Sequence, residues 1–137
     1  MPLSRPNLVL YNHELTMKIV LVEDDPVLSG ILLDRLKSDG YQVLHVETIH
    51  TFEPFLHMYE PDLIITDLLL SGVSARELID YFTQFSCPVF IISTVDQEDL
   101  NYFATMVGAK KFFQKPFDPS RLIDEVNTVR REVINAS

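Results

Sequence analysis

The chain of 137 residues is long enough for one domain with a proper core, and 47% of its residues are hydrophobic. Its 20 acidic residues exceed its 11 basic ones, for a net charge of −9, which argues against a surface that binds nucleic-acid phosphates. The single cysteine excludes an internal disulfide, and no apolar stretch approaches the ~20 residues that cross a bilayer, so we expect a cytoplasmic protein without membrane contact.

Residues 1–16 contain two prolines and no clear period, and we expect a flexible leader or an alternative-start segment. The domain proper is predicted over residues 17–137. Five short apolar runs follow in chain order, each with the length and composition of a buried strand: Lys18–Val22, Tyr41–Val46, Leu63–Thr66, Val89–Ser93 and Lys110–Phe113.

Helical patterns separate and follow these runs. Each has apolar residues at i, i+3 and i+4 spacing, and they extend from 27 to 36, 52 to 59, 78 to 82, 100 to 107 and 122 to 133. Because the strand runs have continuous apolar stretches, both faces of the strands should be covered, which is typical of a parallel sheet with right-handed crossovers. The predicted fold class is therefore α/β, with a doubly wound five-stranded parallel sheet.

Charged residues stand where three of the predicted strands end. Glu23, Asp24 and Asp25 follow the first strand, Asp67 follows the third, and Lys115 comes shortly after the fifth. In a doubly wound sheet, ligands bind outside the carboxyl ends of the strands. Clustered carboxylates repel one another unless a cation neutralises them, and Mg²⁺ prefers carboxylate and phosphate oxygens. The sequence therefore predicts a site for Mg²⁺ and a phosphoryl group, with Asp67 as acceptor and Lys115 as the opposing cation.

Each of these signals also has an ordinary structural explanation. Asp25 fits a helix N-terminus, and Asp67 fits a turn with Ser71-Gly72. Ser93 ends the fourth predicted strand, where its hydroxyl can reach a phosphoryl oxygen, but a Ser-Thr pair more often caps a helix, here one that begins near Asp96. A shared site explains four strand ends at once, whereas the ordinary explanations need four coincidences.

Four motifs resemble the response-regulator receiver domains of bacterial two-component signalling, over residues 17–135: IVLVEDDP, LIITDLLLSGVSARELI, PVFIIST and GAKKFFQKPF. The resemblance implies a flavodoxin-like sheet with strand order 2-1-3-4-5. It also implies a phosphoacceptor that receives its phosphoryl group from a histidine kinase or phosphotransfer protein. Such a domain is not an enzyme beyond slow self-dephosphorylation. A downstream effector would dock on the face made by the fourth helix, fifth strand and fifth helix.

The resemblance implies a metal site with Mg²⁺ as cofactor. Asp67 matches the phosphoacceptor and Asp24 a direct Mg²⁺ ligand. Glu23 matches the second member of the acid pair, which acts through water, and the backbone carbonyl of Leu69 matches the third protein ligand.

The resemblance also implies three residues around the phosphoryl group. Ser93 matches the switch hydroxyl, Lys115 the phosphate-contacting lysine and Phe112 the switch aromatic. The peptide bond between Lys115 and Pro116 is expected to be cis, as in the family.

The chain departs from the family pattern in three places. Ser71 and Ala75 replace the usual proline and glycine after the acceptor, so the loop should be looser and Ala75 should not need φ > 0. Thr94 follows the switch hydroxyl, where the family commonly has a small residue, and its bulk should restrict the access of water to the acceptor. Lys110 and Lys111 replace two acids that join the dimer face of receivers with winged-helix effectors. We therefore expect a monomer, or a weak dimer of another type.

Other functions fit the sequence less well. A degenerate receiver acting as a phosphorylation-independent interaction module is the main alternative. An Mg²⁺-dependent aspartate-nucleophile phosphatase needs an Asp-x-Asp motif, and here the second aspartate is replaced by Leu69. A flavin-binding module needs a phosphate-binding loop after the first strand, where this chain is acidic.

Cys87 is expected to be buried. The histidines have no metal-ligand spacing and are expected on the surface or on helix faces: His13, His45, His50 and His57.

Overall fold

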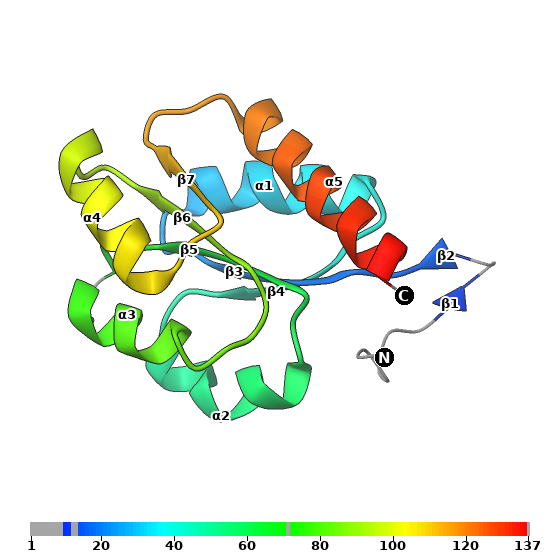
Figure 1. Ribbon diagram of the computed structural model, residues 1–137, viewed down its shortest axis with the longest axis horizontal. Helices are drawn as coiled ribbons and strands as arrows, with labels where there is room; N and C mark the ends of the chain where they lie inside the picture. Colours follow the sequence, from blue (N-terminus) through cyan, green and yellow to red (C-terminus); the bar gives the residue numbers. More distant parts are fainter. Residues whose placement is uncertain (1–9, 12–13, 71, 137) are drawn as a thin grey trace.

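The main sheet has five parallel strands, in the order β4-β3-β5-β6-β7 (Figure 1). The computed structural model describes residues 10–11, 14–70 and 72–136. Numbered within this sheet, the order is 2-1-3-4-5, so the predicted α/β fold is confirmed. The strands are β3 (Lys18–Val22), β4 (Gln42–Val46), β5 (Leu63–Asp67), β6 (Val89–Ser93) and β7 (Lys111–Gln114).

Four strand ends differ by one residue from the prediction. Tyr41 lies outside β4 because its N–H donates to the Leu36 carbonyl at the end of the preceding helix. Asp67 is the last residue of β5, paired with Ile92. β7 lies one residue later at both ends, from Lys111 to Gln114 rather than from Lys110 to Phe113.

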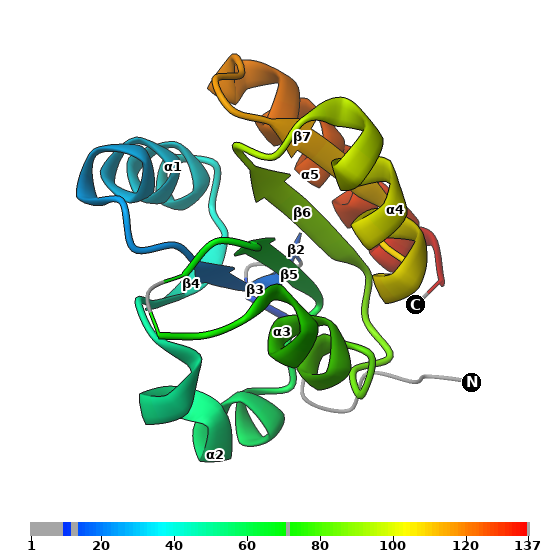
Figure 2. The ribbon, with the colours of Figure 1, turned by 90° about the vertical axis from the view of Figure 1, so that its left-hand side faces the viewer.

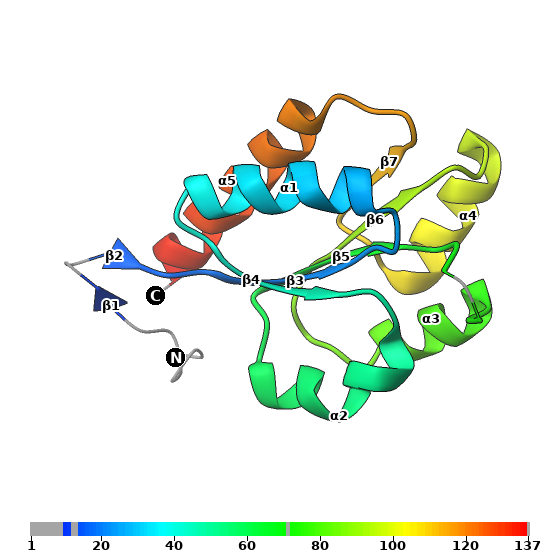
Figure 3. The ribbon, with the colours of Figure 1, turned by 180° about the vertical axis from the view of Figure 1, so that it is seen from behind.

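Helices cover both faces of the sheet (Figures 1 and 3). One core cluster joins α1 and α5 to the sheet, and the other joins α2, α3 and α4. Along β3, Val20 and Val22 enter the second cluster, whereas Ile19 and Leu21 enter the first, as the two-residue period of a strand requires. The helices are α1 (Pro26–Ser38), α2 (Ile49–Tyr59), α3 (Ala75–Phe82), α4 (Gln97–Val107) and α5 (Pro119–Ala136).

Capping residues explain where α1 and α4 begin. The Asp25 carboxylate accepts a hydrogen bond from Val27 N–H at 3.0 Å, so its predicted role at a helix N-terminus is confirmed. Asp96 caps α4 by accepting from Asp99 N–H at 2.9 Å. The alternative that Ser93 caps this helix is therefore wrong. At its other end, α4 stops at Gly108, which has a φ of 73°.

Part of the predicted leader forms a second, small sheet. Strands β1 (Leu10–Tyr11) and β2 (Glu14–Leu15) pair antiparallel and project beyond the start of β3 (Figure 3).

Ala75 is the first residue of α3 and has no positive φ, as expected. The expectations for Ser71 and His13 fall outside the described residues. Within the described segments, no helix is long and apolar enough to cross a membrane.

Candidate functional site

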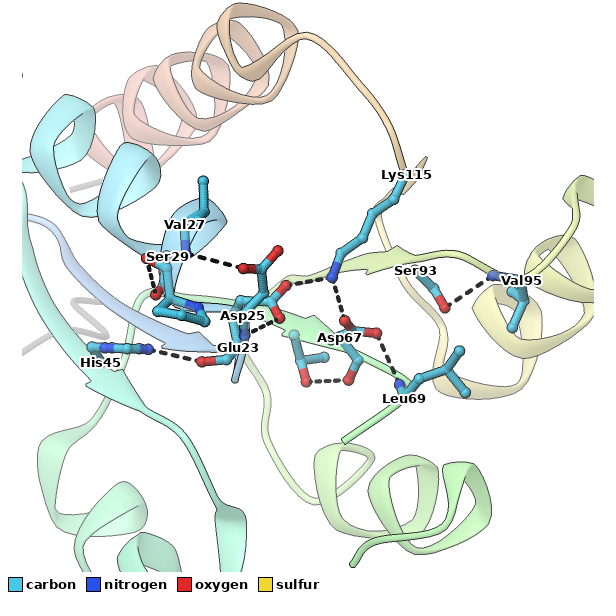
Figure 4. Close-up of polar contacts among 12 residues, drawn as sticks. Glu23, Asp25, Val27, Ser29, His45, Asp67, Leu69, Ser93, Val95 and Lys115 are labelled. Atoms are coloured by element: carbon cyan, nitrogen blue, oxygen red, sulfur yellow. Dashed lines mark hydrogen bonds and ion pairs between the residues drawn. The ribbon is translucent and has the colours of Figure 1, made fainter. Parts of the chain in front are cut away.

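Glu23, Asp67 and Lys115 meet at the carboxyl edge of the sheet, which faces the viewer in Figure 2 and is enlarged in Figure 4. Lys115 Nζ lies 2.5 Å from Asp67 Oδ2 and 2.7 Å from Glu23 Oε1. Glu23 and Asp67 are only 0% and 3% exposed. Two buried carboxylates therefore share one ammonium group, and the predicted convergence of these three residues is found.

The loop after β3 gives its three acids different positions. Glu23 N–H continues the sheet by donating to the Val46 carbonyl at 3.1 Å, and Glu23 Oε2 accepts from Asp25 N–H at 3.0 Å. These bonds turn the Glu23 side chain inward, while Asp25 caps α1. Asp24 is exposed to solvent. Asp24 thus lies beside the buried pair without being enclosed in it.

Burial makes this edge electrostatically costly. The pKa of Glu23 is raised above its ordinary 4.5, chiefly by burial, although contacts with Lys115 and Asp25 N–H oppose the shift. Burial alone would lower the pKa of Lys115, but its contacts with Asp67 and Glu23 outweigh this and raise it. Because the folded pKa of Glu23 is raised, the folded state loses stability as pH rises from 4.5 through that pKa.

The Asp67 carboxylate is oriented by one contact on each oxygen. Oδ1 accepts from Leu69 N–H at 2.8 Å, and Oδ2 faces Lys115. Asp67 therefore holds the backbone two residues further along and at the same time belongs to the charged cluster. The predicted turn with Ser71-Gly72 includes a residue outside the described part of the chain. Lys115 is placed by its own backbone, since its N–H donates to the Ser93 carbonyl at 2.7 Å. The bond between Lys115 and Pro116 is cis, as expected.

Ser93 ends β6, the strand beside Asp67, and Phe112 lies on β7, the next strand of the sheet. Ser93 is 0% exposed, and its hydroxyl oxygen accepts from Val95 N–H at 3.3 Å (Figure 4). Phe112 is half-buried against the α2–α4 core and lines a cavity of about 390 Å³ together with Gln114.

The donor set fits Mg²⁺, although the described residues contain no group of three or more His, Cys, Asp and Glu side chains placed to hold a metal. The carboxylates of Glu23 and Asp67 are hard oxygen donors that already converge on one cation, the Lys115 ammonium. Glu23 Oε1 is buried and makes its ion pair without a hydrogen bond of good geometry. A cation between these carboxylates would reduce the repulsion between them and would give Glu23 Oε1 a further partner.

His45 lies half-buried on β4, next to the acidic loop, although its sequence position gave no sign of this. His45 Nε2 lies 2.8 Å from the Glu23 carbonyl oxygen, so the expectation of a surface or helix-face residue is wrong for this histidine. His57 does lie exposed on α2, where its ring stacks on Phe85 at 4.6 Å. Cys87 is half-buried rather than buried.

A groove of about 460 Å³ opens beside Lys115. Ile31, from the apolar stripe of α1, is 44% exposed and lines it, and Val27 on the same stripe is 69% exposed. This part of the stripe is therefore surface rather than core. Thr94 is exposed and also lies at the groove. The lining residues are Asp25, Leu28, Ile31, Thr94, Lys115, Pro116, Phe117 and Pro119.

Comparison with known proteins decides the family. Residues 19–127 match the Response regulator receiver domain family. The chain belongs to this family. The resemblance read from the four sequence motifs is thus confirmed. Receiver domains are components of two-component signalling, and they are in general phosphoacceptors rather than enzymes.

Relatives and solved structures agree. The transcriptional regulatory protein BaeR of Escherichia coli O6:H1 is 29% identical over 119 residues, or 86% of this chain, which spans about half (50%) of BaeR. Protein PilH of Pseudomonas aeruginosa is 28% identical over 116 residues, 82% of this chain and 96% of PilH. The non-phosphorylated HemR receiver domain of Leptospira biflexa superposes with a TM-score of 0.72 at 28% identity, covering 84% of this chain and 94% of that one.

Proposed function

We propose that this receiver accepts a phosphoryl group on Asp67 from a histidine kinase or phosphotransfer protein, in the presence of Mg²⁺. One observation carries the proposal: a buried carboxylate on Asp67 is oriented by Leu69 N–H and faces the Lys115 ammonium, 2.5 Å away. Membership of the receiver family supports the same role.

Asp67 and Lys115 divide the chemistry between them. A carboxylate oxygen of Asp67 forms the new bond to phosphorus, while the bond from phosphorus to the donor nitrogen breaks. Lys115, released from one carboxylate contact, neutralises a phosphoryl oxygen as a point charge. Bound Mg²⁺ would supply further neutralisation of the incoming phosphoryl charge, held by Glu23 and Asp24 beside Asp67 and the Leu69 carbonyl. Phosphoryl transfer needs mainly such positioning and charge stabilisation.

The partners are proteins at two surfaces. The groove beside Lys115 opens next to the cation that faces Asp67, and its apolar wall includes Leu28 and Ile31. We assign that groove to the phosphodonor. The effector is assigned to the face of α4, β7 and α5, where Phe112 lies.

The direct test is incubation of the chain with acetyl phosphate and Mg²⁺. We expect one acid-stable but hydroxylamine-labile acyl phosphate per chain, absent when a chelator removes Mg²⁺. Failure of the wild type to incorporate phosphate would favour the degenerate receiver that acts only as an interaction module.

Mg²⁺ is expected to raise the melting temperature of the wild type. A ligand that binds only the folded state adds about 2.7 kcal/mol at a hundred times its Kd, roughly 10 °C for a domain of this size. Asp24→Ala should remove the response and stabilise the metal-free protein, because it reduces repulsion around Glu23 and Asp67. Thermal denaturation over a Mg²⁺ titration measures both effects.

Asp34→Ala is the matched control, since Asp34 is an exposed acid on α1 away from the cluster. It should keep the wild-type response to Mg²⁺. A wild type that melts at the same temperature with and without millimolar Mg²⁺ would contradict the metal site.

The chain is expected to stay monomeric when beryllofluoride, a phosphoryl mimic, is added with Mg²⁺. Lys110 and Lys111 already pair within the chain, with Glu132 at 3.2 Å and Glu125 at 3.0 Å. A symmetric dimer through this face would have to exchange these pairs for contacts between chains. Light scattering would reveal such a dimer, and its loss in Lys111→Glu but not in Lys37→Glu would show that our expectation is wrong.

A further inference from the structure

His45 holds a backbone group of the acidic loop from the neighbouring strand. Its Nε2 lies 2.8 Å from the Glu23 carbonyl oxygen (Figure 4). Glu23 N–H donates to the Val46 carbonyl at 3.1 Å. Because a carbonyl oxygen only accepts, Nε2 must carry the proton in this contact. Both backbone polar groups of Glu23 are thus held by β4, one through the main chain and one through a side chain.

The side chain takes the place of a ladder hydrogen bond. If the parallel ladder continued by one residue, the Glu23 carbonyl would accept from Thr48 N–H. Thr48 is instead the N-cap of α2, where the chain leaves the sheet. The ring of His45 reaches the carbonyl at the point where main-chain pairing stops.

This contact bears on the predicted metal ligands. The Glu23 carbonyl belongs to the rigid peptide plane that joins Glu23 to Asp24. Holding its oxygen therefore also fixes the direction in which the backbone continues from Glu23 to Asp24. The Glu23 side chain is held separately, by Asp25 N–H at 3.0 Å and by Lys115 at 2.7 Å. His45 therefore restrains the backbone between the two acids.

We propose that His45 is a positioning residue that sets the Mg²⁺ affinity of the Glu23–Asp24 acid pair. This inference rests on the proposed function, because it takes that pair as the metal ligands. Restraint before binding reduces the ordering cost that the ion would otherwise impose. Loss of a group that orients metal ligands typically weakens binding by about 10–100-fold.

The test follows melting temperature against Mg²⁺ concentration, at constant pH, for the full chain. His45→Leu should need roughly tenfold more Mg²⁺ for half of the shift. His45→Gln should restore most of the affinity, since its amide nitrogen is as many bonds from Cα as Nε2. His45→Asn, one bond shorter, should behave like His45→Leu. His50→Leu, at an exposed position on α2, should match the wild type.

A second readout separates positioning from a merely structural role. With acetyl phosphate, His45→Leu should be phosphorylated slowly at low Mg²⁺ and at the wild-type rate once Mg²⁺ saturates. If only the metal-free melting temperature falls, while the Mg²⁺ midpoints of His45→Leu and wild type agree, the inference is overturned. Should His45→Leu fail to fold, equal midpoints for His45→Asn and His45→Gln would overturn it equally. A wild type that does not respond to Mg²⁺ would instead refute the proposed metal site.

Discussion

Asp67→Asn is expected to reduce phosphorylation by acetyl phosphate to background. The amide that replaces the carboxylate is uncharged and a poor nucleophile, so it cannot form the bond to phosphorus. The shape of the site should survive, because the amide oxygen can still accept from Leu69 N–H, and Lys115 keeps its contact with Glu23. Intact-protein mass spectrometry after incubation with acetyl phosphate and Mg²⁺ measures the loss.

Asp25→Asn provides the matched control at the same edge of the sheet. Asparagine caps helices about as well as aspartate, so α1 should be preserved, and phosphorylation should remain at the wild-type level. Equal incorporation into Asp67→Asn and the wild type would place the acceptor on another residue and refute the proposal.

The strands could be predicted because their sequence signal is local. Runs such as Leu63–Ile65 are apolar without alternation, as expected of a strand covered on both faces, and all five residues of β5 are buried. Once the order of the strands is known, the meeting of Glu23, Asp67 and Lys115 follows from the sheet alone. Lys115 contacts Asp67, 48 positions away, and Glu23, 92 positions away, and the strands that bring these residues together can each be recognised from the local sequence.

The division of roles within Glu23-Asp24-Asp25 could not be predicted from the residues themselves. Three adjacent acids have the same chemistry, and their separation into a buried, an exposed and a capping side chain depends on how the chain turns into α1. That turn is made by the Asp25 cap and by the bond from Asp25 N–H to Glu23. The Asp25 cap can be predicted from its position just before Pro26. The hydrogen bond from Asp25 N–H to Glu23 depends on the folded loop and has no such signal.

The role of His45 depends on register. Its contact with Glu23 exists because β4 lies beside β3 with Val22 opposite Val46, and because main-chain pairing ends one residue later. Neither condition has a local signature around His45. Likewise, the exposure of Ile31 could not be read from its helical spacing, because the stripe of α1 is wider than the surface it covers.

A chain of contacts leads from the acceptor edge to Phe112. Ser93 Oγ accepts from Val95 N–H at 3.3 Å, and the Val95 carbonyl accepts from the Gln114 side chain at 2.9 Å. Gln114 and Phe112 line the same cavity of about 390 Å³. If Ser93 turns its hydroxyl toward a phosphoryl group on Asp67, the Val95 contact is lost and the wall of this cavity can change.

Ser93→Ala is therefore expected to separate phosphorylation from its consequences. Asp67 and Lys115 remain, so the variant should accept phosphate from acetyl phosphate as the wild type does. A bound group shifts a conformational equilibrium only through contacts that differ between the two states, and the hydroxyl contact is that difference here. The chemical-shift changes around Phe112 that beryllofluoride and Mg²⁺ induce in the wild type should nearly vanish. Thr94→Ala, which removes the neighbouring exposed hydroxyl, should retain them. The same shift changes in Ser93→Ala and wild type would mean that the signal reaches Phe112 by a route that does not involve Ser93.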